Sequence, residues 1–189
     1  FINDTMYDGS TISPSFAFDG TGDYITMGNI LDQDGSTAFS ISTWVKYTSA
    51  GTVMIVSKQD GSNIGFLLYS GNFAGVKIAW YPCLASGGNI QVRTSGAYND
   101  GNWHHILATY DGSGNASGAK LYIDGSLDTN IITDTFTGSS SSSGNLQISA
   151  RNGTAFPFSG NQTAVQIYNK ELTSTEVLHN YNALRGRFT

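Results

Sequence analysis

The segment between positions 69 and 98 combines aromatic rings with planar polar side chains. Rings offer flat apolar surfaces, and amide and guanidinium groups offer hydrogen-bonding atoms in fixed geometry, which together are what recognition of a sugar requires. Trp80 and Tyr81 are neighbours on a predicted strand, so one of the two rings points outward whichever way the strand faces. Half-buried packing of each ring is the alternative. We expect a ligand-binding face that draws on Tyr69, Trp80, Tyr81, Asn89, Gln91, Arg93 and Tyr98.

Two adjacent histidines, His104 and His105, are the other candidates for chemistry. Successive side chains of a strand point to opposite faces, so the two rings cannot readily share one metal ion. We expect one to be buried with a hydrogen bond and the other to be partly exposed, and His179 to face solvent. No recognisable arrangement joins Ser or Cys to His and Asp, and Cys83 is the only cysteine, so an internal disulfide is excluded.

The histidines lie in the stretch that organises the chain, residues 101–111. It is β-branched and aromatic, and Asp-Gly pairs bound it, so we predict a central strand. Residues 120–125 predict a second strand, in which Leu121 and Ile123 alternate with Lys120 and Tyr122 before the chain turns. Asp124-Gly125 tolerates the positive φ angles of a two-residue turn, which predicts that residues 126–132 return antiparallel.

Further apolar runs recur along the chain, and seven Asp-Gly pairs punctuate them. This spacing indicates an all-β sandwich or jelly roll in one domain, residues 1–189, and the first residue, Phe1, is compatible with a piece of a longer protein. Residues 1–15 are polar and predict an edge strand or a lead-in, and residues 138–144, with five serines, predict a solvated loop. Two further predicted strands, 16–19 and 23–28, form a pair of short strands around the Asp19-Gly20 turn. The remaining predicted strands are 39–47, 52–58, 64–69, 75–81 and 89–94.

One helix is predicted over about 173–185. Thr173-Ser174-Thr175-Glu176 is a capping box, in which the hydroxyl and the carboxylate satisfy opposite backbone amides. Apolar residues then follow at helical spacing, and Gly186 is expected to end the helix. The predicted core contains Phe18, Ile41, Trp44, Leu67, Leu107, Leu121, Ile123, Ile148 and Val165.

These motifs together resemble a known family. The Trp103-His104-His105 strand, a Gly-rich loop and Leu121-Tyr122-Ile123-Asp124-Gly125 resemble the signature of laminin-G-like domains, of the pentraxin-like branch of the concanavalin A-like lectin/glucanase superfamily. The segments 16–25, 39–45, 158–160 and 165–169 match in order. The resemblance implies an antiparallel two-sheet jelly roll with a short C-terminal helix. Residues 172–188 also resemble the C-terminal ends of structural proteins of tailed phages.

Glucanases of this superfamily carry a Glu-x-Asp-x-x-Glu run on one strand, which supplies two carboxylates about 5–5.5 Å apart. Glu171 and Glu176 are the only glutamates here, and both lie at the predicted helix. We therefore predict no catalysis.

Calcium is the metal that the resemblance implies, because it prefers the oxygen ligands of acidic loops. Asp19 and Asp23 match the family's Phe-Asp-Gly-x-x-Asp loop. Thr163-Ala164 stands where the family usually has Asp-Glu, so part of the expected ligand set is missing. We expect at most one structural Ca²⁺, near Asp19 and Asp23.

The composition limits the classes of partner and the cellular locations that fit the chain. Fourteen acidic and nine basic residues give a net charge of −5, which disfavours nucleic acid, and no apolar run is long enough to span a membrane. Few charges and a single cysteine favour a microbial or viral protein of an extracellular or virion surface over a secreted animal protein or a cytosolic enzyme.

Three functions fit these observations. The first is a non-catalytic lectin-like surface module, preferably of a phage virion, that binds glycan or cell-surface polysaccharide. The second is a structural or decoration subunit without a glycan ligand, which packs against other virion or surface proteins and can oligomerise. The third is the accessory carbohydrate-binding domain of a secreted microbial enzyme.

Overall fold

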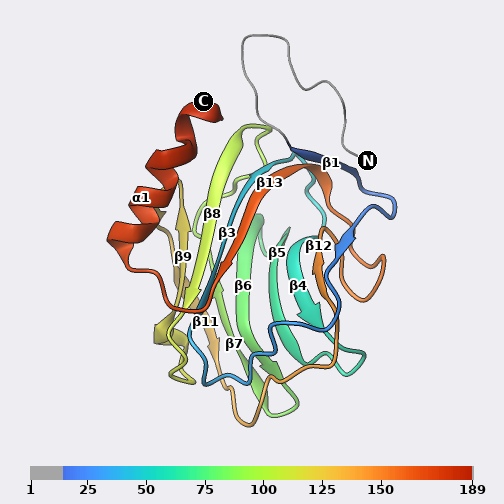
Figure 1. Ribbon diagram of the computed structural model, residues 1–189, viewed down its shortest axis with the longest axis vertical. Coiled ribbons are helices and arrows are strands. Elements are labelled where there is room, and N and C mark those ends of the chain that lie inside the picture. Colours follow the sequence, from blue (N-terminus) through green and yellow to red (C-terminus); the bar gives the residue numbers. More distant parts are fainter. Residues whose placement is uncertain (1–14, 189) are drawn as a thin grey trace.

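The computed structural model describes residues 15–188, which form two antiparallel sheets, one α-helix and two short 3₁₀ turns (Figure 1). The predicted lead-in, residues 1–15, lies outside the described residues except for its last position. In spatial order, the six-stranded sheet contains β1 (Phe16–Asp19), β13 (Ser159–Tyr168), β3 (Phe39–Lys46), β8 (Trp103–Tyr110), β9 (Ala119–Ile123) and β10 (Ser126–Leu127). The seven-stranded sheet contains β11 (Asn130–Asp134), β7 (Gly88–Arg93), β6 (Val76–Ala85), β5 (Gly65–Asn72), β4 (Val53–Gln59), β12 (Leu146–Ile148) and β2 (Ile25–Thr26). The predicted jelly-roll sandwich is confirmed.

The main core lies between the sheets and follows the pleat of the central strands. β3 and β8 pair from Phe39 opposite Tyr110 to Lys46 opposite Trp103. Inward positions of both strands, such as Ile41 and Ile106, are fully buried, as are Leu68, Trp80 and Val92 of the facing sheet. Eight of the nine predicted core residues are buried, and Val165 is half-buried against the same core.

Trp44 is buried, but in a different place from the inter-sheet core. It points out of the six-stranded sheet and stacks on Tyr181 and Phe188 of the C-terminal segment, with ring centroids 5.7 and 4.4 Å apart. The helix α1 (Ser174–Leu184) therefore covers the outer face of this sheet, and Figure 1 shows it beside β8 and β9. A second small core, in which Leu107 and Val177 are fully buried, forms beneath it.

The helix begins as predicted. Thr173 accepts a hydrogen bond from the Glu176 backbone amide, and the Glu176 carboxylate accepts one from the Thr173 amide, which completes the capping box. The helix ends at Leu184, within one residue of the predicted end, and the chain then tightens into a 3₁₀ turn over Arg185–Arg187 that includes Gly186.

Three local predictions are corrected. The strands at 16–19 and 25–26 flank the Asp19-Gly20 turn, but β1 and β2 belong to different sheets, so this segment crosses the sandwich. The turn at Asp124-Gly125 has positive φ at both residues as expected, yet the returning segment divides, because β10 pairs with β9 and β11 crosses to β7.

The serine-rich loop is the third correction. Ser140 and Ser142 are buried, because Ser140 donates to the Gln33 carbonyl and the Ser142 amide donates to Asp32. Lys58, itself fully buried, donates to the carbonyl of Ser142 at 2.9 Å. Ser139, Ser141 and Ser143 stay exposed, so only alternate serines of the loop are buried, and these have hydrogen-bond partners.

Candidate functional site

Five of the seven sequence-predicted ligand residues fall on the outer face of the seven-stranded sheet. We call the surface formed by Tyr69, Tyr81, Gln91 and Arg93 the tyrosine face. Tyr81 lies opposite Leu67 and Tyr69 opposite Ala79, which makes the two tyrosines diagonal neighbours on adjacent strands. Their rings stack, with centroids 5.8 Å apart and planes inclined by 19°. Both are half-buried, so the pair presents aromatic surface to solvent.

Two arginines lie at the tyrosine face, each held against an aromatic ring. The Arg93 guanidinium lies 3.7 Å from the centroid of Phe73 and donates to Gln91 Oε1 at 3.0 Å. Arg151, from the loop after β12, lies 4.8 Å from the centroid of Phe156. Stacking of this kind fixes the plane of a guanidinium while leaving its N–H groups available.

This part of the molecule also holds polar atoms that lack partners. Among residues 15–188, buried side-chain atoms without a hydrogen bond include Gln91 Nε2, Arg93 Nε and Arg151 Nε. Gln59 Oε1 and Asn89 Oδ1 share that property, and the strand register places both on the same outer side. Five of the ten such atoms found among residues 15–188 thus lie on this side of the sheet, which makes it a polar surface where water normally completes the hydrogen bonds.

Burial raises the pKa of the Tyr69 hydroxyl well above its ordinary value of 10, and the neighbouring Tyr81 adds to this effect. The positive charges of Arg93 and Arg151 act in the opposite direction but are weaker. Tyr69 therefore stays a neutral hydrogen-bond donor at any physiological pH.

Two of the predicted ligand residues do not lie on this face. Trp80 is fully buried, because the pleat turns its ring into the inter-sheet core, and its Nε1 donates to the Thr109 carbonyl at 3.0 Å. Tyr98 lies at the rim, where its hydroxyl donates to Asp128 at 2.7 Å and its ring meets His104 edge-on. Trp80 is therefore withdrawn as a ligand contact, while its neighbour Tyr81 supplies the outward ring.

Sequence reasoning missed Arg151 and Phe73. Arg151 follows the short strand β12 in a tight loop closed by reciprocal backbone bonds to Ala155, and nothing in its spacing relates it to positions 69–93. Phe73 occupies the β5–β6 turn beside the predicted segment, so its place within that segment was the available signal.

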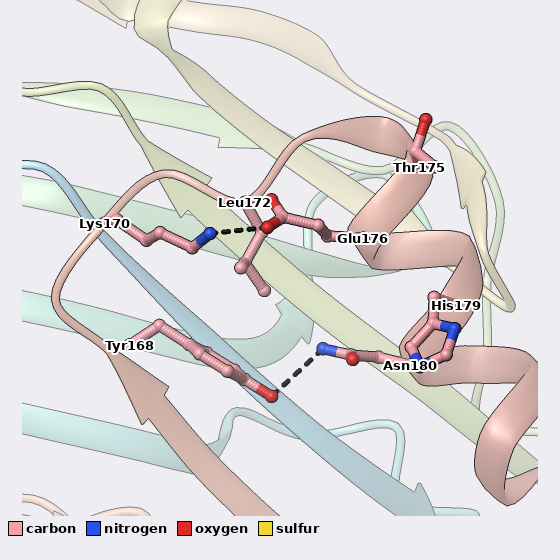
Figure 2. Close-up of a pocket in the computed structure, with 7 residues that line it drawn as sticks. All are labelled: Tyr168, Lys170, Leu172, Thr175, Glu176, His179 and Asn180. Carbon is pink, nitrogen blue, oxygen red and sulfur yellow. Dashed lines mark hydrogen bonds and ion pairs between the residues drawn. The ribbon is translucent and has the colours of Figure 1, made fainter.

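A hollow with a volume of about 460 Å³ lies between α1 and the end of β13 (Figure 2). Four of its polar side chains form two pairs: Lys170 with Glu176, and Asn180 with the Tyr168 hydroxyl at 3.0 Å. These contacts tie the helix to the sheet, so we regard this hollow as part of the helix anchor. His179 at its edge is exposed, as predicted.

The adjacent histidines differ as predicted. His105 is buried and hydrogen-bonded to Ser42 at 2.8 Å, and burial lowers its pKa to about 4. His104 lies between Asp124 at 2.8 Å and Asp100 at 3.2 Å, and the hydrogen bond to Asp124 raises its pKa.

The predicted calcium loop is a tight turn in which the Thr21 amide donates to Asp19 at 2.7 Å and the Asp19 amide donates to Asp23 at 3.4 Å. Nowhere in residues 15–188 do three or more His, Cys, Asp or Glu side chains come together in a way that could hold a metal ion. Two carboxylates alone are a poor set for calcium, and its binding here stays a prediction.

The fold and sequence place the chain in a family. Residues 19–178 match the laminin-G family described as the concanavalin A-like lectin/glucanases superfamily, and the chain belongs to it. No curated protein matches the chain significantly. Among the described residues, no helix has both the length and the apolar character needed to cross a membrane.

Similar solved structures share this architecture. The receptor-binding domain of botulinum neurotoxin D has a TM-score of 0.67 at 19% identity, over 97% of this chain and 47% of that one. The binding domain of Paraclostridial Mosquitocidal Protein 1 has a TM-score of 0.65 at 16% identity, over 85% and 41%. A heptameric pentraxin of Limulus polyphemus has a TM-score of 0.63 at 16% identity, over 86% of this chain and 78% of the pentraxin chain. The chain thus spans less than half of these toxin domains.

Proposed function

We propose that the chain is a non-catalytic, lectin-like module that binds glycan through the tyrosine face. The observation that carries the proposal is the combination there of a stacked tyrosine pair with two ring-supported arginines and unpartnered amide and guanidinium atoms. Aromatic surface packs on the apolar side of a sugar, and the polar atoms bind its hydroxyl groups.

The placement of acidic residues supports binding without hydrolysis. β4, β5, β6 and β7 contain no Asp or Glu at all. Glu171 and Glu176 lie at the helix, where each forms an ion pair with a lysine. The face therefore lacks the pair of carboxylates that a retaining glycosidase needs.

Structural relatives support a recognition role by analogy. One is a botulinum neurotoxin D ligand-binding domain in complex with N-acetylneuraminic acid, similar to this chain with a TM-score of 0.66 at 17% identity. We propose display on a virion or other extracellular surface, with other virion proteins as partners. Affinity for one sugar should be near millimolar, about −4 kcal/mol, and display in many copies would raise avidity.

A glycan array with the chain held as a tetramer tests the proposal. We expect binding that Tyr81→Ala weakens about fivefold or more, the range expected for a lost aromatic contact. Phe16→Ala is the matched control, because Phe16 is an exposed ring on the six-stranded sheet, and it should leave binding unchanged. An array without any binding would favour a structural subunit instead.

A further inference from the structure

We propose that the glycan bound at the tyrosine face carries an oxyanion, a carboxylate or a sulfate ester, and that Arg93 and Arg151 bind it. This inference rests on the proposed function and names the class of saccharide that the site takes. Arg93 lies opposite Ala79, and Ala79 lies opposite Tyr69 on the next strand. Met54 lies opposite Tyr69 on the other side, and its amide donates to the carbonyl of Phe156, whose ring supports Arg151. The sheet therefore brings two cations and a neutral O–H donor to one place.

The two guanidinium groups have no acidic partner within residues 15–188. None of the ion pairs found among residues 15–188 involves either arginine. The strands beneath them contribute no acid, and Asp134 of the edge strand β11 accepts the Ala116 amide instead. A cation that is partly buried without an opposite charge costs free energy, and an anionic ligand removes that cost.

The charge is local rather than general. The chain has only nine basic residues against fourteen acidic ones, yet two of its four arginines lie here. The net negative charge of the protein repels polyanions at long range, so the attraction for an anionic ligand must come from the site itself. This argues against nucleic acid and for a ligand with few, fixed charges.

The geometry suits an oxyanion more than a hydroxyl. Phe73 and Phe156 hold the two guanidinium planes, and the Nε of each arginine is buried, so the terminal nitrogens are the groups that a ligand can reach. The two terminal nitrogens of one guanidinium form a fork that binds two oxygens of a carboxylate or sulfate. Tyr81 would then pack against the ring of the sugar that carries the charge.

Matched pairs of probes test the inference by titration calorimetry of the folded chain. Tri-galacturonate is compared with its methyl ester, and glucose 6-sulfate with glucose, so that each pair differs in charge and shares a sugar. We expect the charged member of at least one pair to bind about tenfold more tightly than the neutral one, and the difference to shrink in 0.5 M NaCl. The pair that shows it distinguishes carboxylate from sulfate.

Substitutions test whether Arg93 and Arg151 cause the preference for charged ligands. Arg93→Gln and Arg151→Gln should each remove most of the preference for charge, and Arg93→Lys should restore only part, because lysine lacks the fork. Arg187→Gln, an exposed arginine of the C-terminal turn, is the matched control and should change nothing. Circular dichroism and thermal unfolding confirm that each variant is folded.

The outcomes separate the two proposals. Equal binding of both members of each pair would overturn the oxyanion and leave glycan binding standing. A preference for charge that survives both Arg→Gln variants, or that Tyr81→Ala leaves untouched, would overturn the assignment to this face. Absence of binding to these probes and to every glycan of the array would overturn the proposed function and this inference with it.

Discussion

Acidification should destabilise this protein through His105. The ring is buried beside Trp44 and Tyr181 and bonded to Ser42, and burial lowers its pKa from the ordinary 6.5 to about 4. The unfolded chain therefore binds a proton near pH 6.5, whereas the folded chain binds it only near pH 4. The free energy of unfolding is highest above pH 6.5 and falls as the pH drops toward 4.

The size of the effect follows from that difference in pKa. Each pH unit is worth about 1.4 kcal/mol, so the full loss attributable to His105 is about 3 kcal/mol, most of it reached by pH 4.5. That is a large share of the free energy of unfolding of a whole domain, which is roughly 5–15 kcal/mol.

Urea unfolding at pH 7.5, 6.5, 5.5 and 4.5 measures this loss in the free energy of unfolding, and the His105→Gln variant serves as the comparison. Glutamine can keep a hydrogen bond to Ser42 but does not titrate, so the variant should lose about 3 kcal/mol less than the wild type over this range. His104→Gln is the control of opposite sign: the raised pKa of His104 stabilises the fold at low pH and stops doing so as the pH rises through it. Parallel pH profiles for the wild type and His105→Gln would refute the reasoning.

Four further predictions concern stability and reactivity. Thr173→Ala removes the capping box and should lower the free energy of unfolding by about 1 kcal/mol in a urea titration, while Thr173→Ser should not. Lys58→Met leaves buried carbonyl oxygens without a donor and should cost about 3 kcal/mol, with faster proteolysis in the 138–144 loop; an unchanged cleavage pattern would contradict this. Cys83 is fully buried and burial raises its pKa to about 11, so maleimide at pH 7.5 should label it only in denaturant. Calcium near Asp19 and Asp23 should bind at about millimolar strength, so that 10 mM adds about 1.4 kcal/mol to the wild type and nothing to the Asp23→Asn variant in thermal unfolding.

The fold was largely predictable because its signals are local. Alternating bulk over 39–46 and 103–110, Asp-Gly at the hairpin turns and the Thr173–Glu176 capping box each act within a few residues. The pairing of short strands was not predictable. β1 and β2 are too short to carry a pattern, and the sheet to which each belongs depends on partners far along the chain.

The sequence indicated which segment carries the candidate site, but not which individual residues form it. Alternation guaranteed that either Trp80 or Tyr81 points outward, but the choice depends on the registration of β6 against β5 and β7, where bulges shift the pairing. Arg151 reaches the face through a loop after β12, a long-range contact that leaves no trace in local sequence. Trp44 was correctly placed in the interior, yet its burial comes from α1, which a pattern within β3 cannot reveal.

The most direct test of the central claim, that glycan binds at the tyrosine face, is a map of backbone amide and side-chain shifts by NMR during titration with the strongest binder from the array. If glycan binds there, the shifts gather around Tyr69, Tyr81, Gln91, Arg93 and Arg151 and saturate together. Shifts that gather instead at the hollow between α1 and β13, around Tyr168 and Asn180, would contradict it.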